Sequence, residues 1–408
     1  MPDLKLSQTF SSLQHPNFRL WFSGQIVSLI GTWMQTTAQG YLVYDLTGSP
    51  IMLGIVGFAN GIPVWLFSLF AGTIADRISR RKMLIITQSS MMVLAFILAA
   101  LTFSDVVRAW HIIILALLLG TANAFDAPGR QSFVVDLVPK QDLTNAIALN
   151  SSVFNLGIII GPTAAGLVYA WLGPGWCFTI NGFSFVAVLL ALSLMKITPR
   201  PQAQAVQDSL VRNLTAGLRF SFKDGNIRVL LIMLTTCAIF GFGLLTLIPA
   251  WATSVLGGDV RTNGLLLSAR GAGSLVATLM IAYVGGRFIR GKIWSVGTLV
   301  LPVALLLFAN FRVLPMSLLM LVVMGWSLMS VVNLTNALIQ THIPDELRGR
   351  VMSVYILLFQ GGMPIGSLIA GWLAGMTSEA ITVFAFASVL LVVAVTIQLR
   401  QPSIRHYN

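Results

Sequence analysis

Charged residues are scarce in this 408-residue chain: Asp, Glu, Lys and Arg make up 9% of it, whereas 56% is hydrophobic. A soluble domain usually carries about 25% charged residues, so too little polar surface is present to cover a water-soluble globule. The mean hydropathy is +0.85, and apolar runs of about 18 residues or more are long enough to cross a membrane. The alternating segments of about 10 residues that mark a transmembrane β-barrel do not occur. The sequence therefore predicts a polytopic α-helical membrane protein.

Residues with catalytic or metal-binding chemistry are also few, with two cysteines and four histidines in the chain. Cys177 and Cys237 lie inside apolar segments, which predicts buried free thiols and excludes a disulfide framework or a zinc site. No HExxH, Ser/His/Asp or phosphate-binding Gly-x4-Gly-Lys-Ser/Thr pattern is found. The polar N-terminal segment lacks the apolar core of a cleaved signal peptide. We therefore expect no enzymatic activity, no cofactor, no metal and no direct use of ATP.

Basic residues outnumber acidic ones, 25 to 13, which gives a net charge of +12. Such an excess can mark a nucleic-acid binder, but these Lys and Arg lie in loops between apolar runs, as in cytoplasmic membrane loops. Twelve spans are predicted, at about 19–44, 50–72, 83–104, 109–128, 146–171, 176–195, 228–251, 262–285, 292–311, 313–336, 350–375 and 380–399. Twelve spans place both termini on one side, and that side then carries 21 Lys and Arg against 3 on the other. We expect an integral plasma-membrane protein with cytoplasmic termini and no nucleic-acid partner.

The longest polar stretch separates spans six and seven. It begins with a Pro-Arg-Pro-Gln run at 199–202, a linker composition, and continues with Leu210, Leu214, Leu218 and Phe222 at helical spacing. This spacing predicts an interfacial helix on the inner leaflet. The predicted organisation is a six-helix bundle over residues 1–195, a cytoplasmic linker with the interfacial helix over 196–227, and a second six-helix bundle over 228–408.

A basic motif recurs at half the chain length. The basic residues at 77, 80 and 82, after span two, return at 287, 290 and 292, after span eight, an offset of 210. The halves are therefore predicted to be parallel repeats related by an axis along the membrane normal, an arrangement that places a transported substrate between them near the midplane. Because one chain supplies both halves, a functional monomer is expected.

Three motifs give the chain a resemblance to the major facilitator superfamily. The segment GTIADRISRRK at 72–82 looks like the family's loop motif between helices two and three, with Ser79 in place of the usual glycine. The segment at 157–166, with Gly157, Gly161, Pro162 and Gly166, resembles the glycine-proline motif of drug/proton antiporters. The segments YDLTGS at 44–49, FDAPGRQ at 125–131 and GLRF at 217–220 resemble the branch that includes enterobactin-type siderophore exporters and macrolide efflux proteins. The resemblance covers essentially the whole chain and implies an all-α major facilitator fold of twelve transmembrane helices that exports a small molecule.

Arg270 is the most informative single residue, because it lies about eight residues inside span eight. An arginine at that depth normally faces a cavity and has a partner, so Arg270 is expected to bind an anionic substrate or to pair with Asp45. Polar side chains that face lipid are costly. Span one places three glutamines near one helical stripe, and span five adds an asparagine; these residues are predicted to face the cavity or to pack against a neighbouring helix: Gln25, Gln35, Gln39 and Asn155.

The loop motif after span two carries the predicted gate. The resemblance implies that Asp76 meets the positive N-terminal end of helix eleven, across the two halves, and holds a cytoplasmic gate shut; Gly72 belongs to the same motif. Arg77, Arg80 and Arg81 are expected to orient Asp76 and to bind anionic lipid headgroups. A solvated turn whose cations fix topology alone is the alternative.

Two further acidic residues are candidates for proton coupling. Asp126 and Arg130 stand four residues apart near the cytoplasmic end of span four, with Pro128 between them, a spacing that suits an i,i+4 ion pair. Three roles stay open: a pair that neutralises itself, a cytoplasmic latch, or proton carriage by Asp126. Asp45 closes span one on the outer side and is either a proton site or an ordinary boundary residue.

Small residues in two spans point to the moving interface. Gly157, Gly161 and Gly166 allow close helix packing, and Pro162 is expected to kink the helix. The resemblance adds a hinge role and a barrier against ion leak. Pro364, in the segment GGMPIG at 361–366, is the counterpart in span eleven.

These features predict a secondary active exporter of a small amphipathic or anionic molecule that works by alternating access in exchange for protons. Because carboxylates within the spans are scarce, an uncoupled facilitator or a lipid or lysolipid flippase of the same fold stays open as the alternative.

Overall fold

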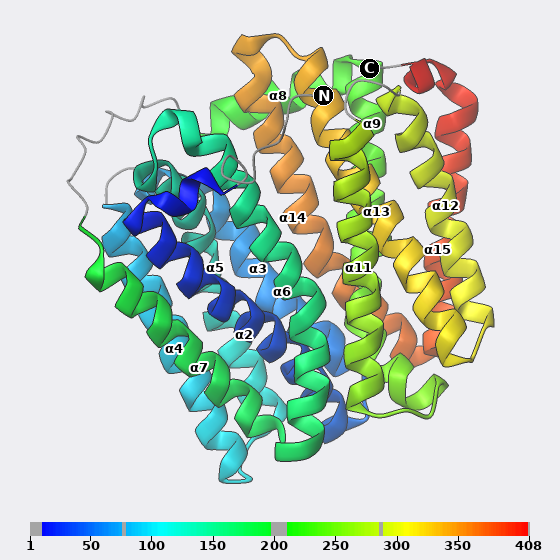
Figure 1. Ribbon diagram of the computed structural model, residues 1–408. Coiled ribbons are helices and arrows are strands. Elements are labelled where there is room, and N and C mark those ends of the chain that lie inside the picture. The colour runs from blue at the N-terminus through cyan, green and yellow to red at the C-terminus, as the bar shows by residue number, and fades with distance from the viewer. Residues whose placement is uncertain (1–9, 76–78, 197–209, 285–288, 407–408) are drawn as a thin grey trace.

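The computed structural model describes residues 10–75, 79–196, 210–284 and 289–406, and most of this chain is helical (Figure 1). The long helices of the first half are α2 (Pro16–Thr47), α3 (Pro50–Ala75), α4 (Arg80–Phe103), α5 (Ala109–Leu137), α6 (Leu143–Leu172) and α7 (Pro174–Leu194). Those of the second half, apart from its first span, are α11 (Val260–Val284), α12 (Arg290–Asn310), α13 (Leu314–His342), α14 (Asp345–Met376) and α15 (Glu379–Arg400). These elements confirm the predicted all-helical fold class.

The first span of the second half is not a regular helix. It begins as α9 (Gly225–Thr236) and continues through a π turn, η3 (Cys237–Phe242), and a 3₁₀ turn, η4 (Gly243–Leu247). It ends with the short α10 (Ile248–Ala250) and a second π turn, η5 (Trp251–Val255). Short π and 3₁₀ stretches inside a helix often mark functional positions.

Eleven helical segments of the described chain are long and apolar enough to cross a membrane. The 32-residue α2 does not belong to these eleven. It carries several glutamine, serine and threonine residues, which lower its hydropathy although its length suffices for a span. In the bundle α2 packs against α6 and α7, which both qualify as spans.

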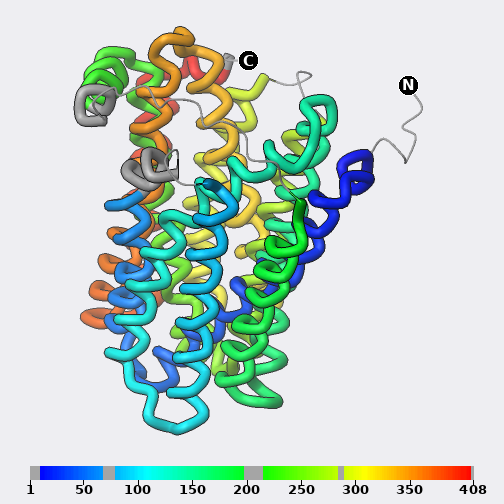
Figure 2. Tube along the Cα trace, turned by 90° about the vertical axis from the view of Figure 1, so that its left-hand side faces the viewer, coloured from blue at the N-terminus to red at the C-terminus, as the bar shows by residue number. Residues whose placement is uncertain are grey.

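The start of α2 and the end of α15 lie at the same end of the bundle, as two perpendicular views show (Figures 1 and 2). We call this the terminal end and the other the opposite end. The linker helix α8 (Leu210–Lys223) also lies at the terminal end (Figure 1) and packs against α14, with Gly217 against the carbonyl of Arg350. The predicted linker helix is therefore present, while its position on a membrane surface stays a prediction.

Each half has its own apolar core. The largest cluster of buried residues lies entirely within 227–404 and contains Trp251, Trp294 and Phe308. The first half is filled by separate clusters, two of which are built around Phe178 and Trp21. Of the buried residues in the Phe178 cluster, Ala250 is contributed by the second half.

One contact between the halves joins α3 to α14, and we call it the α3–α14 seam. A Cβ atom added to Gly54 would lie 2.8 Å from the carbonyl oxygen of Ser367, and one added to Gly371 would lie 2.6 Å from that of Pro50. The backbones of the two helices therefore touch, and only glycine fits at these positions. Farther along, Gly361 packs against the indole of Trp65.

The second contact joins α6 to α11, and we call it the α6–α11 seam. The hydroxyl of Ser268 donates a 2.5 Å hydrogen bond to the carbonyl of Ile159 and lies 2.8 Å from the hydroxyl of Thr163. A Cβ on Gly166 would lie 3.0 Å from Cα of Arg261, at the opposite end of the bundle. Figure 1 shows α6 and α11 converging toward that end.

Both seams begin at the opposite end of the bundle. The contacts run from Pro50 to Trp65 on α3, roughly 22 Å at the rise of an α-helix, and from Arg261 to Gly271 on α11, roughly 15 Å. The α6–α11 seam is therefore the shorter of the two.

Candidate functional site

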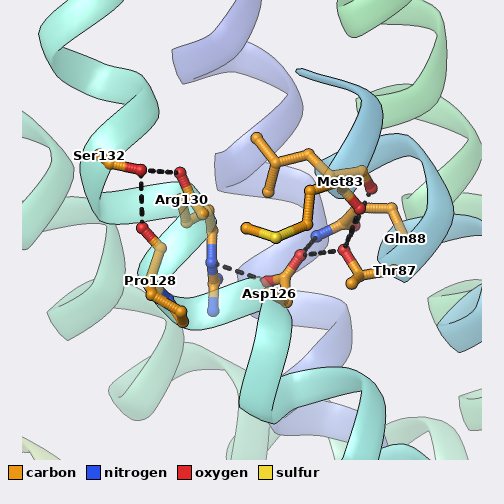
Figure 3. A network of polar contacts seen from close by, with 9 residues as sticks. Met83, Thr87, Gln88, Asp126, Pro128, Arg130 and Ser132 are labelled. Carbon is orange, nitrogen blue, oxygen red and sulfur yellow. Dashed lines mark hydrogen bonds and ion pairs between the residues drawn. The ribbon is translucent and has the colours of Figure 1, made fainter. Parts of the chain in front are cut away.

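Asp126 is the centre of a buried polar network between α4 and α5 (Figure 3). Its side chain is fully buried, with 0% exposure. The Oδ1 atom accepts a 2.9 Å hydrogen bond from the hydroxyl of Thr87 and another of 2.9 Å from Nε2 of Gln88. Both donors come from the terminal-end half of α4, so the network ties that helix to α5.

The predicted i,i+4 pair between Asp126 and Arg130 is present. Nε of Arg130 lies 3.0 Å from Oδ2 of Asp126, and the Arg130 side chain is 24% exposed. Helix α5 continues through Pro128, so the proline does not separate the two residues. The guanidinium supplies the opposite charge that a buried carboxylate needs.

The two oxygens of Asp126 are not equivalent. Oδ1 is used by two donors, whereas Oδ2 forms only the ion-pair contact and no hydrogen bond with any described residue. Thr87, Gln88 and Arg130 together hold the carboxyl group of Asp126 in a defined position between α4 and α5.

Removal of Arg130 should leave an uncompensated charge in the bundle. We expect Arg130→Gln to destabilise the protein by about 3 kcal/mol, the typical result of breaking a buried pair from one side. The double variant Asp126→Asn with Arg130→Gln removes the charge as well and should recover most of that loss. Thermal unfolding in detergent of the wild type, both single variants and the double variant measures the coupling; additive losses would contradict the buried pair.

The analysis of the sequence did not single out Thr87 and Gln88. The segment IITQSSMM at 85–92 places a run of four polar residues inside span three, and this run was the available signal for a polar contact. The spacing along one helix predicted the partner on α5, but nothing in the sequence states which helix lies beside Asp126. The packing of α4 against α5 supplies that information.

The predicted gating residues make contacts within the first half. Arg80 donates to both oxygens of Asp136, at 2.9 Å each, and Arg81 donates to the carbonyl of Ser193. Asp76 and Arg77 lie outside the described residues, and Gly72 is described only as part of the helical backbone of α3. Among the described residues, the Asp126 network contacts only α4 and α5, so in this conformation it does not bridge the halves.

Arg270 lies on α11 at the level where the α6–α11 seam ends. It is ten residues after the start of the helix, or roughly 15 Å along it, and its neighbour Gly271 packs against Ile158 of α6. The residue is 8% exposed, and its Nε atom has no hydrogen-bond partner. No residue of the described chain forms an ion pair with it.

Asp45 does not partner Arg270 in the described structure. It is exposed near the end of α2, where its Oδ2 accepts a 3.3 Å hydrogen bond from the hydroxyl of Tyr169. This is the position of a residue at the boundary of a span. Of the two proton-coupling candidates, Asp126 is therefore the buried one.

The amides predicted to face a cavity or a neighbouring helix are all buried. Gln35 accepts a 2.7 Å hydrogen bond from Nδ2 of Asn181, which joins α2 to α7. Asn155 donates to the carbonyl of Ser151 in its own helix. Nε2 of Gln25 has no partner among the described residues, and Gln39 is 5% exposed. The contact of Gln35 is that of polar packing between helices.

The glycine-proline segment of α6 serves two interfaces. Added Cβ atoms on Gly157 and Gly161 would lie 2.9 and 2.5 Å from Trp33 of α2, whereas Gly166 faces α11 across the seam. The carbonyl of Pro162 contacts Gly264 of α11. In the other half Pro364 packs against Gly61 of α3. The segments at 157–166 and 361–366 therefore both lie where the halves meet.

Eleven long apolar helices of the described chain, arranged in two halves joined by glycine-lined seams, indicate a polytopic membrane protein. The chain matches the transmembrane secretion effector family of the major facilitator superfamily over residues 7–407 and belongs to that family. This confirms the resemblance inferred from the motifs.

Curated relatives of this chain are exporters and transporters rather than enzymes. The chain is 28% identical to the staphyloferrin A transporter of Staphylococcus aureus, over 86% of this chain and 88% of that protein. It is 27% identical to the multidrug efflux pump Tap of Mycolicibacterium fortuitum, over 90% and 91%. It is 21% identical to macrolide efflux protein A of Streptococcus pyogenes, over 88% and 89%.

Solved transporters share the fold. The nucleoside transporter NupG superposes with a TM-score of 0.74 at 16% identity, covering 97% of this chain and 100% of that one. A bacterial homologue of the human lysosomal transporter Spinster superposes with a TM-score of 0.70 at 13% identity, over 98% and 97%. The chain is thus a secondary membrane transporter of the major facilitator type.

Proposed function

We propose that this protein exports a small amphipathic or anionic molecule across the plasma membrane by alternating access, in exchange for protons. The observation that carries the proposal is Arg270: a buried, unpaired guanidinium at the inner end of the α6–α11 seam. An intramembrane arginine without a protein partner is a candidate site for an anionic group of the substrate.

The described conformation is proposed to be the one open to the cytoplasm. The excess of Lys and Arg in the loops at the terminal end favours a cytoplasmic position for that end. The α6–α11 seam then closes the bundle on the outer side of Arg270, and a substrate reaches Arg270 from the inside. The separate cores of the halves support movement of each half as a unit around this level.

Asp126 is the proposed proton carrier. Two observations support this role. Its side chain is buried, and Oδ2 accepts no hydrogen bond from a described residue, whereas Oδ1 accepts from Thr87 and Gln88. A neutral carboxyl no longer holds the Arg130 guanidinium by charge. Protonation would therefore weaken the pair and change how α4 and α5 pack, which is how binding of a proton could bias the two conformations.

The test is proton flux in proteoliposomes that hold the purified protein, under an imposed pH gradient. Siderophores, macrolides, cationic dyes and lysolipids form the panel, in keeping with what the relatives are named for. Proton movement that depends on one of these compounds supports antiport. Transport of a compound without proton movement would reject antiport and favour the uncoupled facilitator or flippase.

Substitution of Arg270 should weaken substrate binding. A hydrogen bond to a charged group contributes about 1.5–3 kcal/mol, so Arg270→Gln should raise the Kd of an anionic substrate roughly 10- to 100-fold. Arg261→Gln is the matched control, because Arg261 lies on the same helix, is half exposed and lies 4.0 Å from Asp259. Binding is measured by tryptophan quenching with the panel compound that is transported; equal losses in both variants would contradict the assignment.

A further inference from the structure

A pocket lies beside the linker helix α8 at the terminal end of the bundle. It has a volume of about 270 Å³ and is formed by three helices: α8 on one side, α9 on the second and α14 on the third. Its walls are mostly apolar, with Leu218 of α8, Leu231 and Ile232 of α9, and Val354 and Leu358 of α14. The Asp126 network and Arg270 do not belong to its lining.

Ser221 of α8 gives the pocket an unsatisfied polar group. The residue is 3% exposed, and its hydroxyl has no hydrogen-bond partner among the described residues. The other hydroxyls of the lining, those of Thr235 and Thr236, already donate to carbonyls of their own helix at 2.8 Å. A buried hydroxyl without a partner is costly, so a ligand group that accepts a hydrogen bond from Ser221 would be stabilised there.

Arg228 places a positive charge in the same pocket. It lies in the first turn of α9, where the span Gly225–Val255 begins, and is exposed. Its guanidinium donates a 3.4 Å hydrogen bond to the carbonyl of Phe222 of α8. Asp224 does not line the pocket, and its Oδ1 accepts from the backbone amides of Asn226 and Ile227 as the N-cap of α9. The polar end of the pocket therefore favours an anion.

We propose that this pocket binds an anionic phospholipid, with the phosphate between Ser221 and Arg228 and one acyl chain between α9 and α14. The lining of α9 runs from Arg228 to Thr236, roughly 12 Å into the span at helical rise. The charged end thus lies at headgroup depth and the apolar end at acyl-chain depth. The volume is below the roughly 300–1,000 Å³ of pockets for drug-sized ligands, which suits a single chain rather than a whole substrate.

Lipid binding would fix the linker helix to the second half. Leu218 and Phe222 of α8 line the pocket together with Leu358 of α14, so a chain in the pocket contacts both helices. The linker connects the two halves of the transporter. An anionic lipid would therefore stabilise the position of α8 against α14, independently of the substrate and proton sites proposed above.

Native mass spectrometry of the delipidated protein in detergent tests the proposal, with palmitoyl-oleoyl phosphatidylglycerol and phosphatidylcholine as probes. The wild type should bind phosphatidylglycerol more tightly, and Arg228→Gln should weaken that binding about fivefold, as expected for one cation at a membrane surface. Arg219→Gln, on the linker helix α8 but outside the pocket lining, should leave it unchanged. Leu358→Trp should fill the pocket and reduce binding of both lipids.

Ser221→Ala supplies a second readout with effects of opposite sign. It should raise the unfolding temperature of the delipidated protein, because it removes the unsatisfied hydroxyl, and should reduce the stabilisation by phosphatidylglycerol. Excess inorganic phosphate should not displace the lipid; displacement would assign the site to free phosphate. Equal effects of Arg219→Gln and Arg228→Gln would overturn the proposal in favour of general attraction to anionic membranes.

Discussion

Asp126→Asn should abolish proton-coupled transport while the protein stays folded. Asparagine keeps an oxygen that can accept from Thr87 and Gln88 but cannot take up a proton at neutral pH. If one proton is exchanged per molecule, a pH difference of two units supports a concentration ratio of the transported compound of about 100-fold at zero membrane potential. The wild type should approach this gradient, and the variant should equilibrate the compound without accumulation. The measurement is uptake of a transported macrolide or siderophore into inverted proteoliposomes, made with the wild type and with the variant.

The matched control for this experiment is Asp136→Asn. Asp136 lies on the same helix, ten residues farther on, and is held by Arg80 near the terminal end. That substitution should lower stability but leave the final accumulation intact. If Asp126→Asn still accumulates the compound under a pH gradient, Asp126 is not the proton carrier and the exposed Asp45 becomes the next residue to test.

Gly371→Ala should shift the protein away from the described conformation. The new methyl group would lie 2.6 Å from the carbonyl oxygen of Pro50 and 2.7 Å from Cα of Gly54, and both are backbone atoms that cannot rotate away. Overpacking of this kind costs about 1–3 kcal/mol, which corresponds to a change of roughly 5- to 150-fold in a conformational equilibrium. In the proposed alternating access this seam opens, so the other conformation should not carry this cost.

The measurement uses spin labels at Leu46→Cys and Thr377→Cys, which lie on either side of the α3–α14 seam at the opposite end. The distance between the two labels should shift to longer values in Gly371→Ala. Both native cysteines are buried, so labelling should be confined to the introduced sites. Gly349→Ala is the control, because Gly349 lies on the same helix and has open space around its Cβ position. An unchanged distribution in Gly371→Ala would mean that the seam does not separate the two conformations.

The fold followed from the sequence to a large extent, since its causes are local. A span is a property of about 20 consecutive residues, and positively charged loops report the side of the membrane on which they stay. The irregular first span of the second half was not foreseen. Within this span Gly243 packs against the backbone of Gly366 of α14, and Gly366 packs against the backbone of Ile239. These contacts join two segments far apart in the sequence, so neither segment alone encodes them.

The candidate site was predictable only where it lies along one helix. The spacing of Asp126 and Arg130 predicted their pair, because residues four apart share a helix face. The donors Thr87 and Gln88 were not identified, since they come from another helix. Likewise, depth in a span marked Arg270 as unusual, but only the packing of α11 against α6 and α13 shows that it is buried without a partner.

The sequence by itself determined that this protein is a two-halved helical membrane transporter of the major facilitator type, because hydropathy, charge placement and repeated motifs act within short stretches of chain. The tertiary structure decided which polar groups meet and where glycines let two backbones touch. These depend on contacts between residues far apart in sequence, such as Gly54 with Gly371 and Ile159 with Ser268. Such contacts are selected by how all the helices pack together.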